Sequence, residues 1–216
     1  MHDTVLGYAD ALSLFTGSCF WHIIINAAGK RSCGVSGEKG WESMEYRDQN
    51  CLIAYFSHAG QNYVSGKLVD LTVGNTERAA RMVRQYTGGA LFHIRRDIPY
   101  PYDYKETVAA ARKEKADKAR PTLERQLDSV APYDVVFLGY PNWCGTMPMA
   151  VWTFLESHDF SGKLIKPFCT HEGSGWGSSL QDLHRLCPTA TIGQGLTLFG
   201  TTILDAEDDV RRWLRQ

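Results

Sequence analysis

The chain has 216 residues, of which 44% are hydrophobic and 12% aromatic, so it is long enough for one hydrophobic core and too short to indicate several domains. Its 23 basic residues nearly balance 24 acidic ones, for a formal net charge of -1. This balance provides no global attraction to nucleic acid or to an anionic membrane, and we expect neither as a partner. The six cysteines form no C-x-x-C pair, which argues against a zinc site or a dithiol redox motif and favours reduced thiols in the cytoplasm.

The first 48 residues differ in pattern from the rest. The apolar run at 11–28 has the character of a signal peptide or a membrane-spanning helix, but His22 and Asn26 interrupt it and no Lys or Arg precedes it. We therefore interpret residues 1–48 as an N-terminal extension without a fold of its own, and we expect the folded domain to occupy residues 49–216.

An alternative hypothesis is that this extension is not part of the natural protein. The stretch GEKG at 37–40 could be encoded by a purine-rich ribosome-binding sequence, and Met44 follows at a suitable distance. Translation would then begin at Met44. Mass spectrometry of the natural protein would contradict this hypothesis if it found peptides from residues 1–43.

From Cys51 onward, short apolar runs alternate with segments that can form helices. The predicted strands are CLIAYF (51–56), ALFHI (90–94), DVVFLGY (134–140) and KLIKPFC (163–169). Apolar runs of this length, separated by amphipathic segments, are typical of βαβ units. The sequence therefore predicts an α/β fold with a parallel sheet that helices cover on both faces.

The first predicted helix is NTERAARMVRQYTGG. Asn75 or Thr76 can cap its first turn, and the glycines at 88–89 can end it. Its apolar residues share one face: Ala79, Val83 and Tyr86.

Four further helices are predicted. Residues 103–120 form a charged helix that ends before Pro121, and its mixed charges are typical of a solvated face. Pro148 suits the first turn of the next helix, whose stripe of apolar residues is expected to pack in the core: Met147, Val151, Phe154 and Leu155. The last two are SSLQDLHRLCP and AEDDVRRWLRQ, the latter with Val210, Trp213 and Leu214 on its inner face.

The loop after the first strand, residues 57–77, offers a site for a phosphate group. Ser57 supplies a hydroxyl, Gly60 and Gly74 permit tight turns, and the helix that follows presents free amides and the positive end of its dipole. The alternative is an ordinary helix cap after a long loop, and this loop alone does not distinguish the two.

Two later loops offer a site for a flat aromatic ligand. In YPNWCGTMPM (140–149), Trp143 lies beyond the strand end, where an indole provides a stacking face next to free turn amides. In THEGSGWGSS (170–179), glycines and hydroxyls accompany Trp176. The alternatives are an indole that covers a hydrophobic edge in the first case and a flexible glycine turn in the second.

Taken together, the three loops resemble those of the flavodoxin family over residues 49–216. The resemblance implies a three-layer α/β/α sandwich with a five-stranded parallel sheet in the order 2-1-3-4-5. It also implies FMN as cofactor, with its phosphate on the first loop and its isoalloxazine ring between the other two. The segment at 98–121 looks like that of a longer bacterial subgroup, and the first loop carries an insertion, NYVSGKLVDLTV.

The resemblance also implies which residues bind the cofactor. On the first loop these are Ser57, His58, Gly60, Asn75 and Thr76, although the insertion leaves open which of them contact phosphate. On the second loop they are Pro141, Asn142, Trp143, Cys144 and Gly145, and on the third Thr170, Glu172, Gly173, Ser174 and Gly175. Backbone amides at 144–145 and 173–175 are expected to bind the ring edge, so that no side chain acts as acid, base or nucleophile.

The expected function is electron transfer through FMN, to a redox partner protein or to a small acceptor. The near-zero net charge differs from the strongly negative field expected of small acidic electron shuttles. A second reading is therefore an FMN-dependent NAD(P)H:quinone reductase or a related reductase of the same fold, and a third is a binding module without cofactor. A metal site of His58, His171 and Cys144 is not expected, because these residues lack paired spacing.

Other enzyme classes lack their motifs. A cysteine phosphatase would need an arginine six residues after Cys144 or Cys169, where Ala150 and Gly175 stand. The stretch around Ser174 does not match G-x-S-x-G, and SHAGQN after the first strand does not match G-x-G-x-x-G.

Overall fold

The computed structural model describes residues 23–25, 31–33, 46 and 49–216. The chain divides into two units, Met1–Trp41 and Glu42–Gln216. In the first unit, β1 (Ile23–Ile25) and β2 (Arg31–Cys33) form an antiparallel pair. Met44, the hypothetical start of translation, lies outside the described residues.

The second unit is built on a parallel sheet with strands in the order β6-β3-β7-β8-β10. Their bounds are β3 Cys51–Tyr55, β6 Ala90–His93, β7 Val135–Pro141, β8 Leu164–His171 and β10 Leu196–Phe199. Counted in chain order among these five strands, the order is 2-1-3-4-5, so the expected topology is confirmed. The short β9 (Thr191–Ile192) pairs with the start of β8 and β10 pairs with its end, so this edge strand is interrupted.

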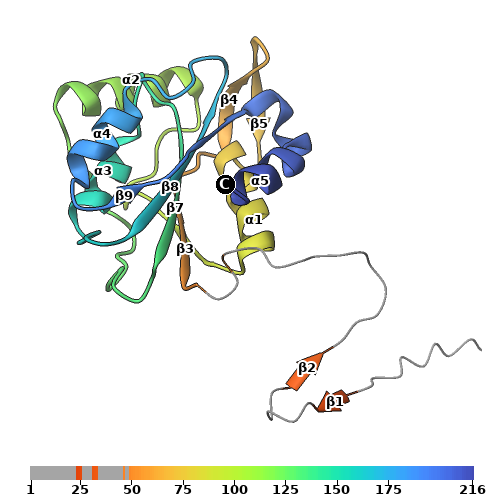
Figure 1. Ribbon diagram of the computed structural model, residues 1–216. Coiled ribbons are helices and arrows are strands. Elements are labelled where there is room, and N and C mark those ends of the chain that lie inside the picture. The colour runs from red at the N-terminus through yellow and green to blue at the C-terminus, as the bar shows by residue number, and fades with distance from the viewer. Residues whose placement is uncertain (1–22, 26–30, 34–45, 47–48) are drawn as a thin grey trace, which may run out of the picture. The chain divides into compact units, whose positions relative to one another are not determined.

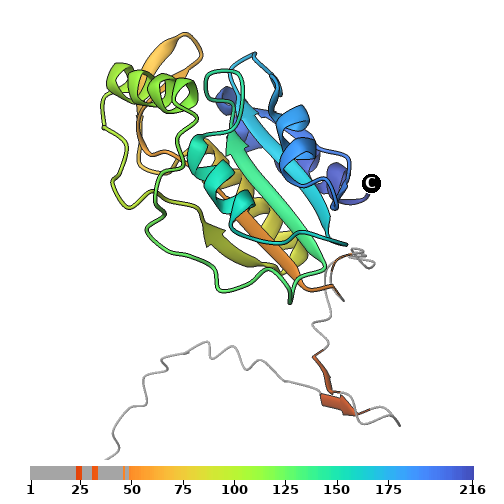
Figure 2. The ribbon, with the colours of Figure 1, turned by 90° about the vertical axis from the view of Figure 1, so that its left-hand side faces the viewer.

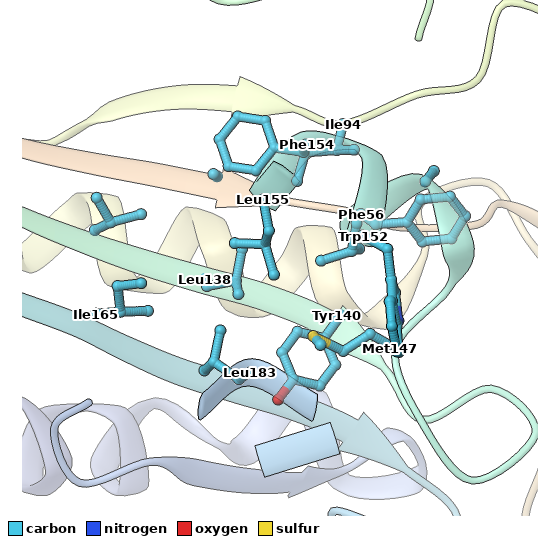
Figure 3. Packing of buried hydrophobic residues seen from close by; sticks show 14 of the residues in the cluster. Phe56, Ile94, Leu138, Tyr140, Met147, Trp152, Phe154, Leu155, Ile165 and Leu183 are labelled. Carbon is cyan, nitrogen blue, oxygen red and sulfur yellow. The ribbon is translucent and has the colours of Figure 1, made fainter. Parts of the chain in front are cut away.

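Helices cover both faces of the sheet (Figure 1). On one face lie α1 (Asn75–Thr87) and α5 (Glu207–Leu214), and on the other α3 (Met149–Glu156) and α4 (Ser179–Leu186). Because successive strand residues point to opposite faces, Ile53 packs with the α1/α5 cluster and Leu52 with the other. Figure 3 shows that second cluster, in which Leu138 and Tyr140 of β7 meet Leu155 and Leu183 of the covering helices. No helix among the described residues combines the length and apolar character needed to cross a membrane.

The helix between β6 and β7 packs mainly against other elements and not against the sheet. The helix α2 (Tyr104–Ala116), between β6 and β7, packs against β4 and α3. Leu123 and Val130, in the segment that follows it, complete the core on that face. Figure 2 shows α2 beside the hairpin of β4 (Gly60–Val64) and β5 (Lys67–Leu71), at the end of the sheet where the strands terminate. Both additions to the basic fold therefore lie at the carboxyl edge of the sheet.

Several local predictions were wrong. The predicted long loop at 57–77 contains the β4–β5 hairpin, whose turn at Ser65 and Gly66 has positive φ at both residues, as the type I′ turn of a two-residue hairpin requires. The N-cap of α1 is Gly74, not Asn75 or Thr76. The helix α2 ends at Ala116 and not before Pro121, because Lys118 adopts a left-handed φ of 49°. The edge strands β9 and β10 were missed, since they are short, half-buried and separated by two glycines.

The predictions of the other elements were confirmed. The four apolar runs form β3, β6, β7 and β8, and the α1, α3, α4 and α5 segments are helical. The inner face of α5 is buried at Val210, Trp213 and Leu214, as its spacing predicts.

Candidate cofactor site

A pocket of about 320 Å³ lies at the carboxyl ends of β3, β7 and β8. The ends of these strands, the loops that follow them and the first residue of α1 contribute these lining residues: His58, Asn75, Pro141, Asn142, Trp143, Cys144, Thr170, His171, Glu172 and Ser174. Two elements that the sequence analysis did not assign to the site also line the pocket: β4 with Gln61, Asn62 and Tyr63, and α2 with Tyr104, Thr107, Val108, Ala111 and Arg112. Gly200, directly after β10, is the remaining lining residue. The pocket thus has loops on one side and the hairpin with α2 on the other.

The first loop closes on the N-terminus of α1 through Ser57. Its hydroxyl accepts a hydrogen bond from the amide of Glu77 at 3.1 Å, so a residue 20 positions earlier caps the helix. This close approach requires Gly74, because a Cβ there would lie 2.3 Å from Ser57 Oγ and 2.4 Å from the His58 carbonyl oxygen. By position, the amides of Asn75 and Thr76 have no acceptor within the helix, and they remain available to an anion.

The second loop is a tight turn between Trp143 and Thr146, whose backbone groups exchange two hydrogen bonds. Cys144 and Gly145 at its tip have φ of 53° and 82°, a conformation that is unusual for the non-glycine residue. Lys115 of α2 donates a hydrogen bond to the Cys144 carbonyl oxygen at 2.6 Å and holds this turn in place.

Trp143 packs within an aromatic cluster and also lines the pocket. Its ring lies edge-on to Phe56, His58 and Tyr100, with ring centroids 5.0 to 5.7 Å apart. Trp176 of the third loop does not line this pocket. It packs beside Tyr140 and under Gly195, so its role in the structure is core packing.

The third loop is tied to the second and to the hairpin. Asn142 Nδ2 donates to the Gly175 carbonyl oxygen at 2.7 Å. Glu172 Oε2 accepts hydrogen bonds from the Ser65 amide at 3.2 Å and from Thr201 Oγ1 at 2.6 Å. The buried hydroxyl of Thr170 lies 2.7 Å from that of Thr76, which joins the third loop to α1.

Nine of the fifteen residues predicted to bind a cofactor line this pocket, and six do not. Ser57 and Gly60 line a second cavity of about 690 Å³ on the other side of the first loop, which shares His58 with the first pocket. The other four lie within the loops without lining the pocket: Thr76, Gly145, Gly173 and Gly175. The hairpin residues were missed, although the Ser-Gly pair between β-prone residues is a turn signal.

The pocket contains polar groups that lack protein partners. Within the described part of the chain, the amides of Cys144 and Ser174 donate no hydrogen bond. His58 Nε2 and Glu172 Oε1 are buried there without a hydrogen-bond partner. Buried polar groups are nearly always satisfied, so a ligand with both donors and acceptors fits this wall.

Burial favours the neutral form of the nearby imidazoles. It lowers the pKa of His58 below the ordinary 6.5, and it lowers the pKa of His171 against the opposing effect of Glu172. Among the residues that the structure describes, no cluster of three or more potential metal ligands occurs. The groups around the pocket are therefore suited to hydrogen bonding.

Comparisons with known proteins agree with this geometry. A flavodoxin family model matches residues 50–216. The structure of a candidate flavoprotein from Bacteroides eggerthii is 32% identical, covers 77% of this chain and 96% of its own, and has a TM-score of 0.62. A similar protein from Bacteroides uniformis is 28% identical over 78% of this chain and 99% of its own, with a TM-score of 0.62.

A more distant structure, a flavoprotein from Lactobacillus acidophilus in complex with FMN, shares the fold. It is 16% identical over 74% of this chain and 99% of its own, with a TM-score of 0.51. A search of curated proteins found no match.

Proposed function

Because the chain belongs to the flavodoxin family, we propose that residues 50–216 bind FMN and transfer electrons through it. The observation that carries this proposal is the pocket at the carboxyl edge of the sheet, where three loops place unpartnered donors and acceptors around one space. Bound FMN would supply the redox chemistry, since its flavin ring accepts and releases electrons. The protein supplies binding, orientation and electrostatics.

The N-terminus of α1 is the proposed phosphate site. The free amides of Asn75 and Thr76 and the helix dipole attract an anion, and Gly74 allows the first loop to approach the helix closely. Ser57 positions this end of the pocket by capping α1.

The second and third loops are the proposed site of the flavin ring. The amides of Cys144 and Ser174 would donate to the oxygen and nitrogen atoms along the ring edge. The orphaned Glu172 Oε1 would accept from a hydroxyl or an N–H group of the cofactor. Trp143 forms an aromatic wall at this end of the pocket.

A reductase acting on a small acceptor is the second candidate. The hairpin and α2 line the pocket opposite the loops, and such a wall limits the approach of a partner protein to the ring while leaving room for a small molecule. The net charge of -1 also provides little steering toward a basic partner.

FMN titration of the full chain tests the proposal. We expect one FMN to bind per chain, with quenching of its fluorescence, and riboflavin to bind more weakly because it lacks the phosphate. A chain that binds neither flavin would overturn the proposal and favour a binding module without cofactor. An anaerobic reductive titration then separates the candidates, because reduction in two one-electron steps favours an electron carrier, whereas a single two-electron step with rapid NAD(P)H oxidation favours a reductase.

A further inference from the structure

One face of α2 forms a wall of the pocket. Tyr104, Val108 and Arg112 all line it, and their spacing of four residues places them on the same side of the helix. Thr107 and Ala111, the buried residues of α2, line the same space. The sequence predicted that the charges of this helix form a solvated face. The structure shows that α2 also presents two large side chains to the pocket, an aromatic ring and a guanidinium.

The ends of α2 are anchored at opposite ends of the pocket. At its start, the Tyr104 amide donates to Gln61 Oε1 of β4 at 3.2 Å, and the Tyr104 ring stacks on Tyr63. Near its end, Lys115 binds the Cys144 carbonyl oxygen of the second loop. Since β4 adjoins the first loop, α2 runs from the proposed phosphate end to the proposed ring end. Arg112, one turn before Lys115, therefore lies near the second loop.

Three cations near Arg112 have carboxylate partners, and Arg112 has none among the described residues. Arg96 pairs with Glu114 at 2.7 Å, Lys113 with Asp117 at 2.5 Å, and Arg120 with Glu156 at 2.5 Å. Arg112 is exposed and forms no ion pair with any described residue. A guanidinium in a pocket wall without a carboxylate partner is suited to bind a carboxylate, sulfonate or phosphate through paired hydrogen bonds.

We propose that Arg112, with Val108 and Trp143, forms a subsite for a planar, anionic small molecule that accepts electrons at the ring end of the pocket. The indole of Trp143 and the side chain of Val108 provide apolar contact for the planar part, and Arg112 binds its anionic group. This subsite rests on the proposed function and names the class of acceptor. With a quinone as acceptor, two electrons and two protons would convert it to the hydroquinone: bound reduced FMN would supply a hydride, and solvent would supply the second proton.

Single-turnover reoxidation tests this subsite. The full chain is loaded with FMN, reduced photochemically without oxygen, and mixed with 1,2-naphthoquinone-4-sulfonate or with neutral 1,2-naphthoquinone. We expect the reoxidation rate of the unaltered protein to saturate at a lower concentration of the sulfonate than of the neutral quinone. Arg112→Gln should reduce this preference about tenfold, the effect of losing one charge-assisted hydrogen-bonded contact. Arg112→Lys should retain part of it, because it keeps the charge and loses the planar fork.

A binding measurement on the oxidised protein gives an independent readout. Naphthalene-2-sulfonate cannot accept electrons, and calorimetry should show it binding to the FMN-loaded chain and about tenfold more weakly to Arg112→Gln. Arg84→Gln is the matched control, because Arg84 is an exposed helical arginine that does not line the pocket. It should leave both measurements unchanged.

Three results would overturn the subsite, and they are distinguishable. If Arg112→Gln leaves the preference for the sulfonate intact, Arg112 does not bind the acceptor. If Arg112→Gln weakens FMN itself tenfold and removes its advantage over riboflavin, Arg112 belongs to the phosphate site. If the unaltered chain binds no FMN, the proposed function fails, and the subsite fails with it.

Discussion

The carboxylate of Glu172 accepts a hydrogen bond from the amide of Ser65, 107 positions earlier in the chain. Ser65 lies in the turn of the β4–β5 hairpin, and Glu172 lies directly after β8, so this contact ties the tip of the hairpin to the third loop. Thr201 donates to the same carboxylate oxygen and joins the segment after β10. One side chain thereby connects three segments that border the pocket.

Replacing Glu172 should detach the tip of the β4–β5 hairpin from the third loop. In Glu172→Ala the Ser65 amide loses its acceptor, and a hydrogen bond to a charged group contributes about 1.5–3 kcal/mol. We therefore expect FMN to dissociate roughly tenfold faster or more, measured by the recovery of flavin fluorescence after dilution. Glu106→Ala makes the same charge change at an exposed residue of α2 that does not line the pocket, and should leave the rate unchanged. Equal dissociation rates in the two variants would contradict this role.

The contact between Lys115 and Cys144 should influence the reduction potential. The ammonium group lies beside the second loop, where it favours the reduced flavin if that form is anionic. Lys115→Met removes the charge and keeps the length of the side chain. We expect the affinity for reduced FMN, relative to that for oxidised FMN, to fall about two- to fivefold, because an exposed charge contributes little. The reduction potential of the bound flavin should fall by the corresponding amount.

The control for this prediction is Lys113→Met. Lys113 is exposed on the same helix and pairs with Asp117 instead of with the loop. Potentiometric titration at low and high salt should show a salt-dependent shift in Lys115→Met alone. The same shift in both variants would mean that only the overall charge matters.

A side chain at position 74 should disturb the proposed phosphate site. In Gly74→Ala the new Cβ would clash with Ser57 Oγ and with the His58 backbone, which cannot move away as a flexible side chain can. Overpacking of this kind costs about 1–3 kcal/mol, to be measured by urea unfolding of the protein without cofactor. FMN affinity should fall more than riboflavin affinity, since the change lies at the phosphate end. An equal loss for both ligands would place the phosphate elsewhere.

Stability should fall in mild acid because of two histidines, His58 of the first loop and His93 of β6, which both line the second cavity. Burial lowers the pKa values of His58 and His93 below 6.5. Below about pH 6.5 the unfolded chain takes up protons that the folded chain does not, so the free energy of unfolding is greatest above pH 6.5. It should decrease as the pH falls from 6.5 toward the lowered pKa values.

Urea unfolding at pH 7.5 and 5.5 checks this dependence. The unaltered chain should lose more stability between these two values than His58→Gln, because glutamine does not titrate. An identical loss in both proteins would show that His58 does not contribute to the pH dependence.

Local pattern was sufficient to predict four of the five main strands of the central sheet and the four helices that cover it. Strands such as CLIAYF and DVVFLGY are apolar because both faces of a parallel sheet are buried. The buried face of α5 could be predicted from the helical spacing of its apolar residues. The three loops could be located as well, since ligands in such sheets bind beyond the carboxyl ends of the strands.

What the sequence by itself determined is therefore the succession along the chain of four strands, of the helices between them and of the loops at their ends, because these depend on short-range periodicity. Only the tertiary structure decided that Ser57 caps α1 across 20 residues, that Glu172 ties the hairpin to the third loop, and that α2 lines the pocket. The helix α2 buries only Thr107 and Ala111, so its sequence carries no apolar stripe strong enough to identify the surface it covers. Its place depends on contacts with Gln61 and Cys144, which are distant in the chain and have no signature in local sequence.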